Sequence, residues 1–170
     1  MDDIPLHNTI APLEQESSFL ASQSSPIVLG LAVFLLVLIN HAIYVELAVV
    51  MHNRYTVPLF ERNKRMLFRL SLYSTIIVLV CSHLVEISIW ALALVLAGLV
   101  PSFHEAAFFS GSTYTTLGYG NDLLPNSWDT ITVMIALSGM FSIAWTTSSL
   151  INMVGVFHTT RLHTPKNVGR

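Results

Sequence analysis

Three long apolar stretches, residues 26–51, 66–100 and 130–157, alternate with polar segments along the chain. Each is longer than the roughly 20 residues that an α-helix needs to cross a hydrocarbon core about 30 Å thick. The pattern therefore predicts three membrane-spanning helices, and the length of the second predicts tilt or an interfacial first turn. Pro58 is expected to end the first helical region, and Pro101 the second.

The composition supports a membrane protein. Hydrophobic residues make up 53% of the chain and charged residues 11%, whereas a soluble domain carries roughly 25% charged residues. So much apolar surface also excludes a disordered chain. The net charge is −2 and no basic stripe is present, so we expect no nucleic-acid partner. The single cysteine, Cys81, cannot form an intrachain disulfide.

The positions of the few charges predict the topology. All eight lysines and arginines fall within 54–69 and 161–170, whereas most acidic residues precede 26 or lie within 101–129. Cytoplasmic loops of membrane proteins are enriched in Lys and Arg. We therefore expect a multi-pass protein of the inner or plasma membrane with its N-terminus outside. The expected parts are an outer tail (1–25), an additional first span (26–51), a basic cytoplasmic loop (52–66), a unit with two further spans (67–157) and a cytoplasmic tail (158–170).

The segment 101–122 is too apolar for a solvated loop, and too short and glycine-interrupted for a further span. Ser102 is expected to cap a helix, with Glu105 three residues later closing a capping box. The two glycines that follow permit positive φ angles, which allow successive carbonyls to point the same way. Non-helical backbone survives at membrane depth only where protein buries it or a wet pathway uses it. The segment therefore predicts a re-entrant helix and loop between an outer helix (67–100) and an inner helix (130–157).

Residues 116–120, Thr-Leu-Gly-Tyr-Gly, resemble the selectivity filter of potassium channels. A Gly-Tyr-Gly tripeptide is weak evidence by itself, but Thr113 and Thr115 precede the filter at the family spacing and Pro125 follows it. Over residues 67–157 the chain is similar to the small bacterial single-pore members of this family, which implies that these residues form a pore domain with a pore helix and filter at 101–122. The similar features include His83-Leu-Val-Glu86, Trp90-Ala91, and Gly139 with Trp145.

The resemblance implies passive potassium conduction with no catalysis. One chain supplies one filter strand, so a homotetramer in the lipid bilayer is implied, with K+ in the filter and no organic cofactor. An accessory protein is neither indicated nor excluded. The implied ion ligands are Thr116, Leu117, Gly118 and Tyr119, with Gly120 completing the filter, and the implied outer-mouth residues are Glu105, Asn121, Asp122 and Asp129.

Four positions depart from the family pattern. Leu117 replaces a valine, Asn121 an aspartate, and Phe109 a tryptophan whose N–H steadies the filter tyrosine in many relatives. Ser112 stands where some members have an acidic residue. These departures leave a weakly selective cation channel as an alternative.

The third apolar stretch has one polar helical face. Its residues recur every three or four positions, which favours either the lining of an aqueous cavity or small-residue helix packing. Gly139 is open to two interpretations, a hinge or a close-packing site. The predicted cavity-lining residues are Ser138, Ser142, Thr146, Ser149 and Asn152, followed by a candidate hydrophobic gate at Met153, Val156 and Phe157.

Ionisable side chains inside the first two spans form a second candidate site, because they are costly in a membrane. His41 and Glu86 lie at about the same depth, counted at 1.5 Å per residue. We expect a polar cluster of Asn40, His41, His83 and Glu86. It could fix helix packing, sense protons or bind a metal. A non-conducting assembly that uses it as a metal or partner site is the remaining alternative.

Overall fold

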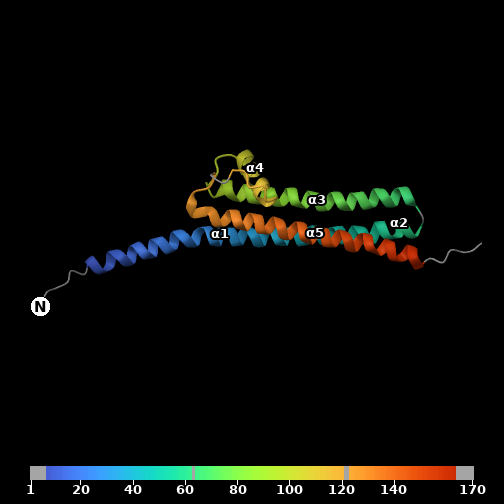
Figure 1. Cartoon of the computed structure of the whole chain (residues 1–170), viewed down its shortest axis with the longest axis horizontal. Coiled ribbons are helices and arrows are strands. Elements are labelled where there is room, and N and C mark those ends of the chain that lie inside the picture. Colours follow the sequence, from blue (N-terminus) through green and yellow to red (C-terminus); the bar gives the residue numbers. More distant parts are fainter. Residues whose placement is uncertain (1–6, 63, 121–122, 164–170) are drawn as a thin grey trace, which may run out of the picture.

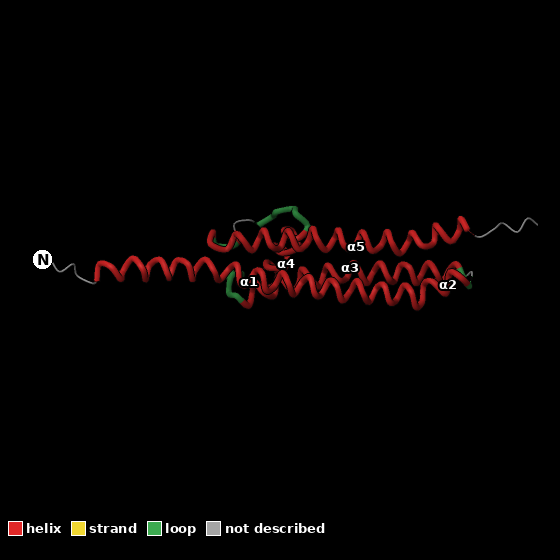
Figure 2. Tube along the Cα trace, turned by 90° about the horizontal axis from the view of Figure 1, so that it is seen from below, coloured by secondary structure: helices red, strands yellow, loops and turns green. Residues whose placement is uncertain are grey.

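The computed structural model describes residues 7–62, 64–120 and 123–163, with side chains described between 25 and 155 except at 61 and 65. Within these ranges every regular element is a helix, and there is no strand (Figure 2). The elements are α1 (His7–Met51), the π-helix η1 (His52–Thr56), α2 (Val57–Glu61), α3 (Arg65–Leu96), α4 (Phe103–Tyr114), the 3-10 helix η3 (Asn126–Trp128) and α5 (Asp129–His163).

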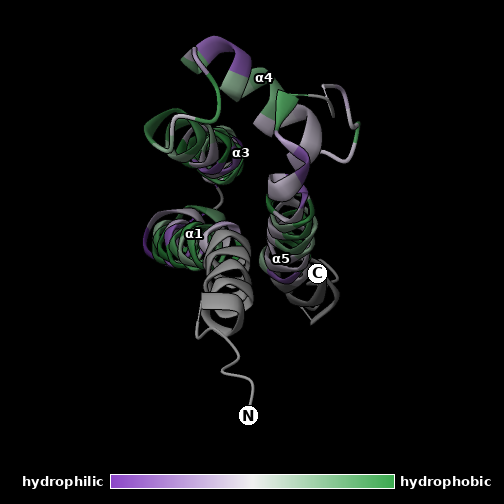
Figure 3. Cartoon of the chain, turned by 90° about the vertical axis from the view of Figure 1, so that its left-hand side faces the viewer, coloured by the Kyte–Doolittle hydropathy of each residue, from purple (hydrophilic) through white to green (hydrophobic). Residues whose placement is uncertain are grey.

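The three long helices α1, α3 and α5 run side by side, and each contacts the other two (Figure 1). Seen end-on, they occupy the corners of a triangle, and the short α4 lies across α3 and α5 at one end (Figure 3). The turn around α2 lies at the opposite end of the bundle (Figure 1). The loop that carries residues 115–120 is therefore held at the α4 end.

The prediction of three apolar spans is confirmed. The helical stretches Ser25–Phe60, Met66–Leu96 and Asn126–Gly155 are long and apolar enough to cross a membrane. Many large apolar side chains on all three remain exposed in the single chain, including Ile43, Leu84 and Ile151. This exposure is what helices in contact with lipid or with other chains require.

The helix does not end before Pro58, contrary to the prediction. Residues 52–61, expected as part of a loop, continue as η1 and α2, and α3 begins at Arg65. Pro58 lies in the first turn of α2, directly after the π-helix η1. Proline lacks the N–H that a regular helix bonds one turn earlier, and prolines in continuous helices accompany local irregularities such as this π-helical turn.

The second span ends at Leu96, earlier than the expected Pro101. Gly98 adopts φ +70°, and the N–H of Leu99 donates to the carbonyl of Leu94 at 3.0 Å. A left-handed glycine with this six-residue closure terminates helices because no Cβ opposes it. The chain then turns toward Ser102, which caps α4.

Two groups of buried side chains hold the bundle together. The larger lies at the α4 end and joins Val37 of α1, Trp90 of α3, Phe109 of α4 and Ile135 of α5. The smaller lies nearer α2 and joins Val45 and Ala48 of α1 with Leu79 of α3 and Met153 of α5. The first span is thus part of the same core as the other helices.

Gly139 is a close-packing position in α5. A Cβ atom at this position would lie 2.0 Å from the carbonyl oxygen of Tyr114 and 2.9 Å from its ring. The inner helix therefore touches the last residue of α4 directly, which favours the packing interpretation over the hinge.

We predict that Gly139→Ala weakens the fold, because its methyl group overlaps backbone that cannot rotate away. Overpacking of this kind costs about 1–3 kcal/mol. Thermal unfolding in detergent should show a lower midpoint for Gly139→Ala than for the wild type. Gly155→Ala is the matched control, since a Cβ there meets no atom within 4 Å. Equal midpoints for the two variants would contradict the contact.

Candidate pore loop and buried polar network

Helix α4 leads directly into the loop, and both of its ends are well defined. Ser102 has an extended backbone, and its hydroxyl accepts from the N–H of Glu105 at 3.2 Å, so the predicted cap is confirmed. The helix ends at Tyr114, and residues 115–120 that follow are all exposed in the single chain.

The loop backbone alternates in the sign of φ. Thr116, Gly118 and Gly120 have φ of +61°, +75° and +86°, while Leu117 and Tyr119 between them are not positive. A threonine in the left-handed region is uncommon, whereas glycine enters it at no steric cost. Such alternation turns successive carbonyls toward one side of the strand and successive N–H groups toward the other.

The hydrogen bonds of the loop follow this division. The N–H groups of Leu117 and Gly118 both donate to the carbonyl of Ser112, at 2.7 and 3.2 Å, and that of Thr116 donates to Thr113 at 2.9 Å. No described residue donates to the carbonyls of residues 116–118. The carbonyl of Tyr119 differs, because the Ser112 hydroxyl donates to it at 2.7 Å.

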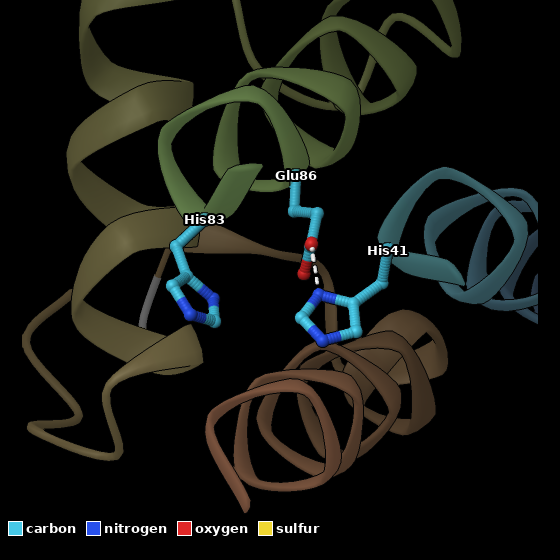
Figure 4. Close-up of side chains that lie close together, drawn as sticks. All are labelled: His41, His83 and Glu86. Atoms are coloured by element: carbon cyan, nitrogen blue, oxygen red, sulfur yellow. Dashed lines mark hydrogen bonds and ion pairs between the residues drawn. The ribbon is translucent and has the colours of Figure 1, made fainter. Parts of the chain in front are cut away.

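The second site is a polar network buried between the helices. His41 Nδ1 of α1 lies 2.7 Å from Oε1 of Glu86 on α3, and both side chains are fully buried. The Tyr114 hydroxyl at the end of α4 donates to the other carboxylate oxygen at 2.6 Å. His83 Nδ1 lies 2.8 Å from that hydroxyl. Figure 4 shows the two imidazoles on either side of the Glu86 carboxylate.

Thr146 of α5 closes the network on its far side. Its Oγ1 lies 3.1 Å from His83 Nε2 and 3.4 Å from His41 Nε2. The ring centroids of His41 and Trp145 are 5.4 Å apart, so the Trp145 indole packs on His41. Five side chains from α1, α3, α4 and α5 thus form one closed ring of hydrogen bonds.

The donation from Tyr114 to Glu86 sets the donor directions of its neighbours. His83 donates to Tyr114 through Nδ1–H and accepts from Thr146 at Nε2. His41 donates to Glu86 through Nδ1–H, and its Nε2 lies 3.4 Å from Thr146 Oγ1.

The structure brings three of the four predicted cluster residues together. Asn40 is the exception, because its Nδ2 is buried and has no hydrogen-bond partner among the described residues. At the predicted outer mouth, Glu105 and Gly120 line one small cavity of about 160 Å³. Asp129 is exposed at the start of α5, and Asn121 and Asp122 lie outside the described residues.

The predicted lining of an aqueous cavity differs from what the structure shows. Ser138, Ser142 and Thr146 are buried inside the chain, and the Trp90 indole N–H donates to Ser138 at 3.0 Å. Ser149 is partly exposed and Asn152 exposed. These residues share one helical face as predicted, but Ser138, Ser142 and Thr146 on it are packed inside the chain. Ser138 bonds to Trp90 of α3, and Thr146 to His83 of α3 and His41 of α1.

The structure also differs from the prediction at the first residue of the candidate gate. Met153 is buried in the smaller core group against α1 and α3, so it does not face an opening along α5. The side chains of Val156 and Phe157 lie outside the described residues.

Sequence reasoning missed two members of the network, Tyr114 and Thr146. Both lie in segments interpreted for another purpose, Tyr114 in the approach to the filter and Thr146 in the cavity face. Each oxygen of a buried carboxylate needs a hydrogen-bond donor. This requirement at Glu86 was the signal that could have pointed to Tyr114.

Comparison with known families identifies part of the chain. Residues 75–155 match the model of a family described as "Ion channel", and this match covers just under half of the chain. It spans most of α3, all of α4, the loop and α5 as far as Gly155, and it leaves out α1. No curated protein and no solved structure gives a significant match. Together with the three apolar helices, the match indicates a membrane protein and supports an ion channel function.

We predict that Tyr114→Phe destabilises the fold, because it leaves an oxygen of the buried Glu86 carboxylate without its donor and removes the partner of His83 Nδ1. Leaving buried polar groups unsatisfied costs about 1–3 kcal/mol. Tyr73→Phe on the exposed face of α3 is the matched control. Thermal unfolding of both variants in detergent tests the prediction, and an equal effect of the two substitutions would contradict the network.

Proposed function

We propose that the chain forms a potassium-selective channel that conducts passively through a homotetrameric, carbonyl-lined filter. The observation that carries the proposal is the alternation of φ at Thr116, Gly118 and Gly120. The carbonyls of residues 116–118 have no donor among the described residues, and the segment is similar in sequence to a potassium filter. Such carbonyls can replace the hydration shell of a dehydrated potassium ion.

The position of α4 supports the same function. Its C-terminal end, where helix carbonyls concentrate partial negative charge, leads directly into the loop. If α4 and the loop enter the membrane as a re-entrant segment, this end stabilises a cation below the filter. Backbone of this kind at membrane depth needs a wet pathway or surrounding protein, and a pore supplies both.

The exposure of the loop supports a multimer. Residues 115–120 are exposed, and the side chains of Leu117 and Tyr119 are 68% and 64% exposed. Beside them lies an open apolar groove of about 500 Å³ between α4, Ile87 of α3 and the loop. Three further copies around a central axis would cover this surface and complete the ring of carbonyls.

The orientation follows from the basic residues. Arg54, Arg62, Lys64 and Arg69 lie near the α2 turn, at the end of the bundle opposite α4 (Figure 1). The enrichment of Lys and Arg in cytoplasmic loops assigns the α2 end to the cytoplasm. The filter and the N-terminus then lie outside, where Glu105 and Asp129 attract cations to the mouth.

The burial of Ser138, Ser142 and Thr146 changes which side of α5 faces the pore. In the proposed channel the opposite, exposed side of α5 takes this place, including Met140, Thr147 and Ile151. The central cavity is therefore less polar than the sequence pattern alone indicates.

We predict that Gly118→Ala abolishes potassium flux into vesicles that contain the chain. Alanine at φ +75° is strained by about 1–2 kcal/mol, and relief of that strain turns a carbonyl out of the row. Gly98→Ala is a matched control, because Gly98 has φ +70° but lies in the turn after α3. It should carry a similar strain and retain flux within about twofold.

Two results would contradict the proposal. Equal flux through Gly118→Ala and the wild type would show that the loop is not the conducting element. Wild-type flux no greater than that of empty vesicles would favour a non-conducting assembly.

A further inference from the structure

We propose that His41, His83 and Glu86 form a binding site for one divalent transition metal ion of the zinc type, which joins the first helix to α3. This site is separate from the conducting loop, and it does not rest on the proposed channel function. Each of the three residues offers one ligand atom, and these atoms lie within 4.8 Å of one another.

The two imidazoles direct the same nitrogen toward the carboxylate. His41 Nδ1 lies 2.7 Å from Glu86 Oε1, and His83 Nδ1 reaches Glu86 Oε2 through the Tyr114 hydroxyl by steps of 2.8 and 2.6 Å. Ligands about 2.0–2.2 Å from a tetrahedral zinc ion lie roughly 3.4 Å from each other. Ion binding would draw the three ligand atoms together from within 4.8 Å and would separate the Tyr114 hydroxyl from His83 Nδ1.

The second ring nitrogen of each histidine, Nε2, faces the same hydroxyl oxygen. Both Nε2 atoms face Thr146 Oγ1, at 3.1 and 3.4 Å. An imidazole that ligates through Nδ1 carries its proton on Nε2, and such N–H groups are normally held by an acceptor. A hydroxyl oxygen has two lone pairs, so Thr146 can accept from both rings once an ion is bound. In the metal-free network His83 instead donates through Nδ1–H to Tyr114, and ion binding exchanges that tautomer for the ligating one.

The donor set selects the kind of ion. Two imidazoles and one carboxylate suit zinc, with a water molecule as the fourth ligand, and they suit calcium or magnesium poorly. Tyr114 stays a phenol and donates to the second oxygen of Glu86, which orients the carboxylate.

Burial also favours an ion here. His41 and Glu86 are fully buried within apolar helices, where a carboxylate needs a compensating charge. A bound dication supplies that charge and displaces the proton between His41 and Glu86. His83 is only partly buried, which gives the ion an approach from one side.

The test is a titration of the purified full chain in detergent, first treated with a chelator and then given Co²⁺ as a spectroscopic substitute for Zn²⁺. We expect one Co²⁺ per chain with the intense visible absorption of a tetrahedral site, displaced by Zn²⁺. Glu86→Gln, which keeps the size of the side chain, should weaken binding at least about 100-fold. His104→Gln is the matched control, because His104 is exposed on α4, and it should bind like the wild type.

Thr146→Val provides a second test that leaves every ligand in place. It removes the shared acceptor, and loss of such a partner weakens metal binding by about 10–100-fold. If Glu86→Gln does not fold, Thr146→Val and His83→Gln decide the question. Absence of a tetrahedral Co²⁺ spectrum in the folded wild type would overturn the proposal, as would unchanged binding in Thr146→Val and His83→Gln. Metal binding is measured without conduction, so a failed flux assay leaves this result unaffected.

Discussion

The buried carboxylate of Glu86 imposes the constraint that the helix arrangement satisfies. A carboxylate in apolar surroundings is costly unless each oxygen has a donor. Here one oxygen lies 2.7 Å from His41 on α1 and the other accepts from Tyr114 on α4 at 2.6 Å. A single side chain therefore binds both the first helix and the end of α4 to α3. Since the ion channel match covers residues 75–155, this contact also fastens an additional helix to the matched unit.

Tyr114 connects the polar network around Glu86 to the loop that follows α4. Its hydroxyl belongs to the polar network, while its carbonyl lies against α5 so closely that Gly139 has no room for a Cβ. The residue that immediately precedes 115–120 is thus held from two sides. Uncommon backbone conformations such as φ +61° at Thr116 persist where the surrounding structure fixes them. The rigid end of α4 and the alternating loop are parts of one arrangement.

Much of the fold was predictable because its signals are local. Apolar length gave the three spans, and Ser102 with its spacing to Glu105 gave the start of α4. The direction of the polar face of α5 was not predictable, since periodicity shows that Ser138 and Thr146 share a face but not what that face meets. Their partners, Trp90 and His83, lie 48 and 63 positions away. Tertiary contacts of this range decide between a wet cavity and a satisfied core.

A bi-ionic reversal potential tests directly whether the loop 115–120 selects potassium. The full chain is reconstituted in a planar bilayer with potassium on one side and sodium on the other. For a potassium-selective filter we expect a large reversal potential, with the sign given by potassium leaving its own side. A reversal potential near zero would contradict it and would identify a weakly selective cation pore.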